Sequence, residues 1–324
     1  MIIITLFLSL FIFSFFLIKS SDLVILAIRR ISKKVGAKVF VLSAIILAVG
    51  TSLPEFFVGI TSALEGSPNL SLGNVLGANI ANISLVAGLS AFILGKVNIK
   101  GEAIKKDLFF AFLAGLLPLL LIIDRELSRV DGLILLAVYA GYASSFFKNR
   151  FVQIAQENLD QKFVHRFLRE FVHTETVLSK DLGSLFIGIA LLLFSADVIV
   201  RVGTFLASLA GVPVFIVGLV ILSMGTTLPE LAFSFKSLGN KEPSMFLGNL
   251  FGSIIANSTL ILGTVSVISP VSLMTVEKYS LAAVAFIIIF ITFWFFIRSK
   301  HRLDRWEAGV LLVMYLLFLV AEFS

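Results

Sequence analysis

Two glutamate residues lie at matching places inside apolar stretches of the sequence. Glu55 ends the segment ILAVGTSLPE at residues 46–55, and Glu230 ends the segment ILSMGTTLPE at residues 221–230. An isolated charge in the middle of a membrane helix costs about 2.5–3.5 kcal/mol on insertion scales. Two such carboxylates facing each other also repel, and a divalent cation between them removes both penalties. The pattern therefore predicts that Glu55 and Glu230 bind a cation; the alternative is a buried carboxyl group that is protonated or paired with a basic residue.

A proline precedes each glutamate and interrupts the hydrogen bonding of its helix. Pro54 and Pro229 have no N–H group, so the carbonyl groups of Gly50 and Gly225 lose their helical partners. Irregular backbone at membrane depth is tolerated where it is buried or lines a polar cavity. Carbonyl and hydroxyl oxygens of these segments then provide the hard ligands that Na⁺ and Ca²⁺ prefer. The hydroxyl groups belong to Thr51, Ser52, Thr226 and Thr227.

A second pair of motifs reads LGNVLGANIAN at residues 72–82 and LGNLFGSIIAN at residues 247–257. Residues four positions apart share a helix face. The two faces consist of Asn74, Ala78 and Asn82, and of Asn249, Ser253 and Asn257. Asn82 and Asn257 are predicted neighbours of the cation, whereas hydrogen bonds between helices are expected for the two earlier asparagines. Glycine pairs on these helices predict close packing: Gly73 with Gly77, and Gly248 with Gly252.

Both motif pairs are separated by the same 175 positions, which indicates an internal repeat. Asp22 and Asp197 keep this offset too, and a structural role is expected for both, with Asp197 pairing with Arg201 one helical turn away. If each copy contains five helices, the second copy crosses the membrane in the opposite direction. Inverted repeats of this kind are typical of secondary transporters, although channels also contain them.

Composition indicates that the motifs lie in membrane helices. The chain has 324 residues, of which 58% are hydrophobic and 14% charged, and its mean hydropathy is +1.05. These values exclude an ordinary soluble domain. We predict an all-α membrane protein with ten transmembrane helices in two inverted five-helix repeats. The predicted spans are 2–18, 39–64, 70–95, 108–123, 130–147, 182–200, 212–235, 244–269, 279–297 and 306–321, and the first and sixth helices are expected to extend further towards the cytoplasm.

The distribution of basic residues predicts the orientation. Most Lys and Arg residues follow the odd-numbered helices, which places these loops in the cytoplasm and both termini on the extracellular side of the cell membrane. We divide the chain into a first repeat at 1–147 with its motifs in 46–90, a cytoplasmic linker at 148–181, and a second repeat at 182–324 with its motifs in 221–265. The net charge of +6 then reflects cytoplasmic loops, and neither a nucleic acid nor an obligatory protein partner is expected.

These residues give the chain its resemblance to the calcium/cation antiporter superfamily, and specifically to prokaryotic sodium/calcium exchangers. GTSLPE and GTTLPE, each followed by GN-x-x-G-x-x-x-x-N, carry the resemblance over both halves. It implies Ca²⁺ coordination by Glu55 and Glu230 with the backbone carbonyls of Thr51 and Thr226. It implies Na⁺ coordination at Ala48, Ser52, Ser223, Thr227 and Ser253. Asn82 and Asn257 would line the central position.

The resemblance implies an antiporter that exchanges Ca²⁺ for Na⁺ by alternating access at one shared site near the membrane midplane. The same glutamates could instead serve Ca²⁺/H⁺ exchange, and a cation channel is a weaker alternative. Two residues depart from the family pattern: Ala78 replaces a frequent serine, and Asn257 replaces the aspartate of archaeal exchangers, which leaves two carboxylates. The sequence holds no cysteine, no histidine cluster and no nucleophile–base arrangement, so neither an enzyme nor a cofactor is expected.

Overall fold

The computed structural model describes residues 2–34, 52–95, 97–98, 102–157, 175–240, 243–273, 276–300 and 302–323. The described residues are almost entirely helical. In the first half the elements are α1 (Ile2–Lys34), α3 (Leu53–Leu64), α4 (Pro68–Ala81), the π-helix η1 (Asn82–Val86), α5 (Ala87–Leu94), β1 (Val97–Asn98), α6 (Glu102–Leu121), the 3₁₀-helix η2 (Ile122–Asp124), β2 (Glu126–Leu127) and α7 (Arg129–Glu157).

The second half begins with the long helix α9 (Glu175–Ala210). It continues with α10 (Val214–Ile216), the π-helix η3 (Val217–Leu222), α11 (Ser223–Thr226), α12 (Leu228–Gly239), α13 (Pro243–Ile255), the π-helix η4 (Ala256–Ile261), α14 (Leu262–Ile268), β3 (Val271–Ser272), α15 (Val276–Lys300), β4 (Arg302–Leu303) and α16 (Arg305–Phe323). Helices α1 and α9 extend past their predicted spans, as expected.

Eight helical segments among the described residues are long and apolar enough to cross a membrane, and each coincides with a predicted span. They are Ile4–Ala27, Pro68–Leu94, Lys106–Asp124, Lys180–Ala210, Val214–Gly239, Pro243–Ile268, Val276–Ser299 and Arg305–Phe323. Of the span predicted at 39–64, the described part is the shorter apolar helix Leu53–Leu64. The span predicted at 130–147 lies within α7, which is helical but not among the eight. The count of ten therefore stays a prediction.

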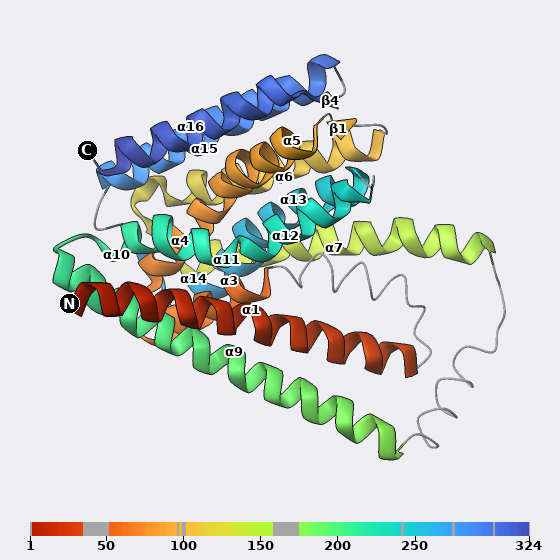
Figure 1. Ribbon diagram of the computed structural model, residues 1–324, viewed down its shortest axis with the longest axis horizontal. Helices are drawn as coiled ribbons and strands as arrows, with labels where there is room; N and C mark the ends of the chain where they lie inside the picture. Colours follow the sequence, from red (N-terminus) through yellow and green to blue (C-terminus); the bar gives the residue numbers. More distant parts are fainter. Residues whose placement is uncertain are drawn as a thin grey trace.

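The helices form an elongated bundle whose polar groups face inward. Helices α1 and α9 pack against each other along one side, and α15 and α16 lie on another (Figure 1). Large apolar side chains on the outside are exposed, among them Phe7 and Phe11 on α1 and Phe186 and Phe194 on α9. Buried serine, threonine, asparagine and glutamate residues occupy the interior. These polar residues lie beside a large apolar core, and the exposed apolar exterior suits surrounding lipid.

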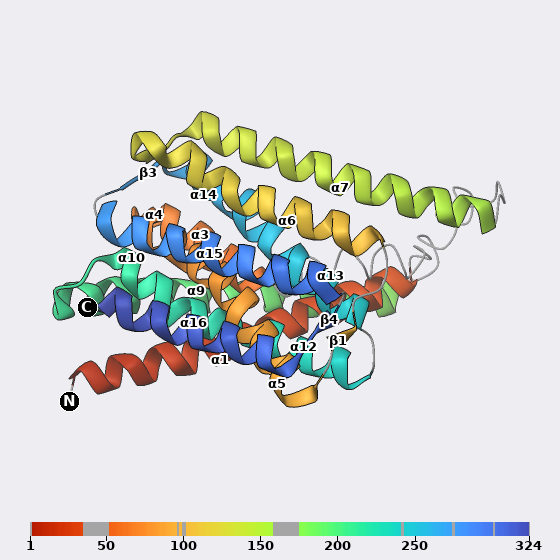
Figure 2. The same cartoon turned by 90° about the horizontal axis from the view of Figure 1, so that it is seen from above.

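The 175-residue offset of the motifs is also present in the secondary structure. Helices α3 and α12 begin and end at equivalent positions, as residues 53–64 and 228–239. Strand β1 pairs antiparallel with β4, and β2 pairs antiparallel with β3, so each two-stranded sheet joins one half of the chain to the other. The two sheets lie at opposite ends of the bundle, whereas both chain termini lie at the same end (Figure 2).

The two halves also meet at a glycine seam between α4 and η3. A Cβ atom placed on Gly73 or Gly77 would collide with the backbone carbonyls of Phe215 and Leu219, and one on Gly218 would collide with that of Leu70. The two backbones can approach this closely because none of the three glycines has a side chain. The predicted close packing is thus confirmed for Gly73 and Gly77. The segment equivalent to 215–219 in the first half is 40–44, which lies outside the described residues.

Candidate cation-binding site

The predicted site residues that the structure describes are all buried in the polar interior. Glu55 and Glu230 have 0% of their surface exposed. The others are Ser52, Asn82, Ser223, Thr226, Thr227, Ser253 and Asn257, each exposed by 2% or less. Ala48 and Thr51 lie outside the described residues.

Both glutamates lie in the first turn of a helix. Glu55 belongs to α3, which starts at Leu53, and Glu230 belongs to α12, which starts at Leu228. In the second copy the residue Thr227 separates α11 from α12, so the helix is interrupted next to the proline, as predicted. The N-terminal end of a helix carries partial positive charge, which stabilises a carboxylate there. The interruption at Thr227 thus makes the buried Glu230 less costly than an acid in mid-helix.

Each glutamate helix packs against the π-helix that holds the asparagine of the other half. Helix α3 contacts η4, which contains Asn257, and α12 contacts η1, which starts at Asn82. π-Helical turns are rare and occur frequently at functional sites. The arrangement brings the two predicted motifs of both halves to one region of the interior.

Hydrogen bonds across the halves fix several of these side chains. The Thr226 hydroxyl donates to Asn74 Oδ1 over 3.2 Å, which confirms the predicted interhelical role of Asn74. The Thr226 side chain also interacts with the carboxyl group of Glu55. Within the second half, Ser253 Oγ donates to Glu230 Oε1 over 3.3 Å. The site is therefore built from both halves together, and neither half contains it alone.

Two hydroxyl groups that precede Glu230 in the chain, those of Ser223 and Thr227, donate their protons to the backbone. Thr227 Oγ1 donates to the carbonyl oxygen of Ser223 over 2.8 Å, and Ser223 Oγ donates to that of Leu219 over 2.5 Å. A hydroxyl group that donates in this way keeps its oxygen lone pairs for another partner. These oxygens suit a neutral ligand set for a hard cation.

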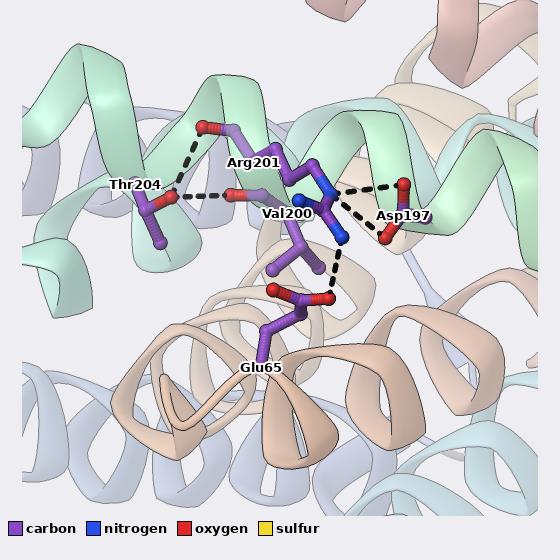
Figure 3. A network of polar contacts seen from close by, with 5 residues as sticks. All are labelled: Glu65, Asp197, Val200, Arg201 and Thr204. Carbon is purple, nitrogen blue, oxygen red and sulfur yellow. Dashed lines mark hydrogen bonds and ion pairs between the residues drawn. The ribbon is translucent and has the colours of Figure 1, made fainter.

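The basic residues that could have neutralised the glutamates are engaged elsewhere. Arg201 contacts Asp197 through Nε at 3.0 Å, as predicted, and also contacts Glu65 through Nη2 at 2.8 Å (Figure 3). Lys19 Nζ lies 3.8 Å from Asp22 Oδ2. Within the described part of the chain, neither carboxyl oxygen of Glu55 has a hydrogen-bond partner of good geometry. The alternative of a carboxyl group paired with a basic residue therefore finds no support at Glu55.

The described residues contain no group of three or more His, Cys, Asp or Glu side chains that could hold a metal ion. A cation bound here would have two carboxylates and otherwise neutral oxygen atoms as ligands. Divalent and monovalent hard cations are both compatible with such a set, since they are selected by ligand number, cavity size and flexibility.

Sequence reasoning overlooked two polar residues next to the site. Both are buried, and Asn79 donates a hydrogen bond to Ser258 over 2.8 Å. Asn79 also accepts a hydrogen bond from Asn257. Asn79 is outside the face shared by Asn74 and Asn82, so helical spacing did not single it out. Its own residue type, an asparagine in an apolar helix, was the available signal.

A family model described as "Sodium/calcium exchanger protein" matches residues 5–148 and again residues 180–323, which together form most of the chain. The chain belongs to the sodium/calcium exchanger family. The two matched segments keep the 175-residue offset of the motifs at both ends.

Several proteins are similar to this exchanger-family protein over more than three quarters of its length. It is 27% identical to the sodium/calcium exchanger MaX1 of Methanosarcina acetivorans over 95% of both chains. It is 27% identical to the inner membrane protein YrbG of Escherichia coli over 78% of this chain and 76% of that protein. A solved structure of the sodium-calcium exchanger NCX_Mj matches with a TM-score of 0.63 at 24% identity, covering 98% of this chain and 99% of that one, which shows a shared fold.

Proposed function

We propose that this family member exchanges Ca²⁺ for Na⁺ across the cell membrane at one shared site. The supporting observation is the pair of fully buried acids, Glu55 and Glu230, each on a helix that packs against the asparagine-bearing π-helix of the other half. Membership of the sodium/calcium exchanger family supports a cation antiporter. The buried set of oxygen ligands supports Ca²⁺ and Na⁺ as the exchanged ions. Ca²⁺ binds between the two carboxylates with the carbonyl oxygens of Thr51 and Thr226, and Asn82 and Asn257 line the centre.

Na⁺ ions occupy the neutral oxygens around the same acids in this proposal. The set consists of Ala48, Ser52, Ser223, Thr227 and Ser253. The hydroxyl protons of Ser223 and Thr227 point to backbone carbonyls, which supports a role for their oxygens as ligands. Since Na⁺ and Ca²⁺ need the same carboxylates, one ion leaves before the other binds, and this competition couples the two fluxes.

The proposed transport cycle uses two inverted five-helix repeats and alternating access. The location of the two strand pairs at opposite ends of the bundle supports the inversion (Figure 2). The repeats are residues 1–147 and 182–324, joined by a cytoplasmic linker at 148–181. The shared end of the two termini, together with the excess of basic residues in the loops after odd-numbered helices, supports an extracellular position for both termini.

A Na⁺ gradient is expected to drive Ca²⁺ in the opposite direction in proteoliposomes that contain this protein alone. Vesicles loaded with Na⁺ and diluted into K⁺ medium should accumulate ⁴⁵Ca²⁺, and vesicles loaded with K⁺ should not. The reason is the neutral hydroxyl set beside the two glutamates, which suits Na⁺ as the counter-ion. The measurement is the initial rate of ⁴⁵Ca²⁺ uptake.

The matched control imposes a pH gradient of either sign without Na⁺. Uptake driven by the proton gradient, and not by Na⁺, would replace the proposal by Ca²⁺/H⁺ exchange through the same glutamates. Ca²⁺ entry that requires no counter-ion at all would instead favour a channel.

A further inference from the structure

A chain of three buried polar side chains links the two halves beside the proposed site. Asn79 on α4 donates from Nδ2 to Ser258 Oγ over 2.8 Å. Its Oδ1 accepts a hydrogen bond from Asn257 Nδ2 over 3.2 Å. Asn79 is 2% exposed, and its two partners are fully buried. In a buried setting of low dielectric such hydrogen bonds are strong, so each one fixes the orientation of the groups it joins.

The repeat does not duplicate this chain of side chains, because the positions equivalent to Asn79 and Ser258 hold apolar residues. The residue equivalent to Asn79 is Ile254, and the residue equivalent to Ser258 is Ile83. Both isoleucines are fully buried. The fold therefore accepts apolar side chains at these positions, and helix packing alone does not account for the polar ones.

The contact with Asn79 leaves the two ends of the Asn257 amide in different surroundings. The nitrogen end is held by Asn79, whereas Asn257 Oδ1 has no hydrogen-bond partner among the described residues. A buried amide oxygen without a partner is costly, and a bound cation would satisfy it. Turned by half a revolution, the same amide would present its NH₂ group, which repels a cation.

We propose that Asn79 is a positioning residue, which holds the Asn257 amide so that its oxygen and not its nitrogen is available to the transported Ca²⁺. The inference rests on the proposed function of the site. Asn257 needs such a partner because only the oxygen of its side-chain amide can bind a cation. A carboxylate has two equivalent oxygens, so with an acid at this position either orientation would provide a ligand.

The test measures Ca²⁺ affinity by calorimetry on the purified full chain in detergent. Asn79→Leu removes the hydrogen bond and places at residue 79 a side chain similar to that of its counterpart, Ile254. We expect Ca²⁺ to bind about 10-fold or more weakly, the scale found when the partners of metal ligands are removed. Ser258→Ala keeps the Asn79 oxygen that accepts from Asn257 but frees the other end of the Asn79 amide, so it should weaken Ca²⁺ binding less than Asn79→Leu does.

The decisive comparison repeats the substitution with an acid at position 257. In the Asn257→Asp background, Asn79→Leu should change the Ca²⁺ affinity by about twofold or less, since a carboxylate needs no orientation. A merely structural role of Asn79 would lower the affinity equally in both backgrounds and would overturn the inference. Asn79→Ala, which removes the amide without adding bulk, is measured in parallel in case the leucine variant does not fold.

Failure of the inference is distinguishable from failure of the proposed function. If the unmodified protein binds Ca²⁺ and Asn79→Leu and Asn79→Ala bind it equally well, the positioning role is wrong and the function stands. If the unmodified protein binds no Ca²⁺, the proposed function is wrong and the inference falls with it.

Discussion

Changing Glu55 or Glu230 to Gln is expected to abolish Ca²⁺ transport while the protein remains folded. Glutamine has nearly the same shape, so packing inside the bundle is kept. It removes one of the two carboxylate charges proposed to bind the cation, and both glutamates are fully buried, where charge interactions are strong. We expect initial ⁴⁵Ca²⁺ uptake to fall by at least about 100-fold, the upper end of the effect of removing a metal ligand's partner.

Proteoliposomes with a Na⁺ gradient provide the measurement, and elution from size exclusion together with the melting temperature reports on folding. The control variant is Glu126→Gln, the same chemical change at an exposed residue of β2. Its uptake should equal that of the unmodified protein. Near-normal uptake by either Glu55→Gln or Glu230→Gln would refute a site that needs both carboxylates.

Gly77→Ala is expected to disturb the fold itself. The added methyl group would overlap the carbonyl oxygen of Leu219 in η3, and it would also press on the Ser223 hydroxyl. Backbone atoms at the contact of two packed helices have little freedom to move aside. We expect a loss of about 3 kcal/mol in the free energy of unfolding, the upper end of the range for overpacked interiors.

The same substitution at Gly141 on α7 is the matched control, because a Cβ atom there meets nothing within 4 Å. The two variants are compared by their melting temperatures in detergent. The melting temperature is read from the fraction of protein that stays monodisperse after heating. A melting temperature for Gly77→Ala equal to that of Gly141→Ala would mean that the α4–η3 contact is looser than the structure describes.

Apolar length and residue type were sufficient to predict much of this architecture. Eight predicted spans coincide with helices, because 20 or so apolar residues in a row have few other stable forms. The pair Asp197–Arg201 follows from helical spacing alone. Arg201 also contacts Glu65, which is 136 residues away in the sequence. The sequence contains no signal of this second contact.

The contacts that complete the candidate site were harder to predict. Helical spacing gave the shared face of Asn74 and Asn82, but not the rotation of that helix against its neighbours, which decides that Asn79 meets Asn257. The π-helical turns at η1 and η4 shift this rotation, and a single residue of extra winding leaves no periodic signal in a short segment. The two-residue strands were also missed, since they are too short to produce an alternating pattern.

The hydrogen bonds between the halves have a consequence for how the protein is made. Asn74 finds its partner Thr226 only 152 residues later in the chain, and Asn79 finds Ser258 after 179 residues. At ordinary translation speeds this delay is roughly 8–36 s. During that time the first half has left the ribosome with amides and a carboxylate that lipid cannot satisfy. The buried amides of the first half therefore reach these partners only after the second half has been made, so the polar interior is completed late.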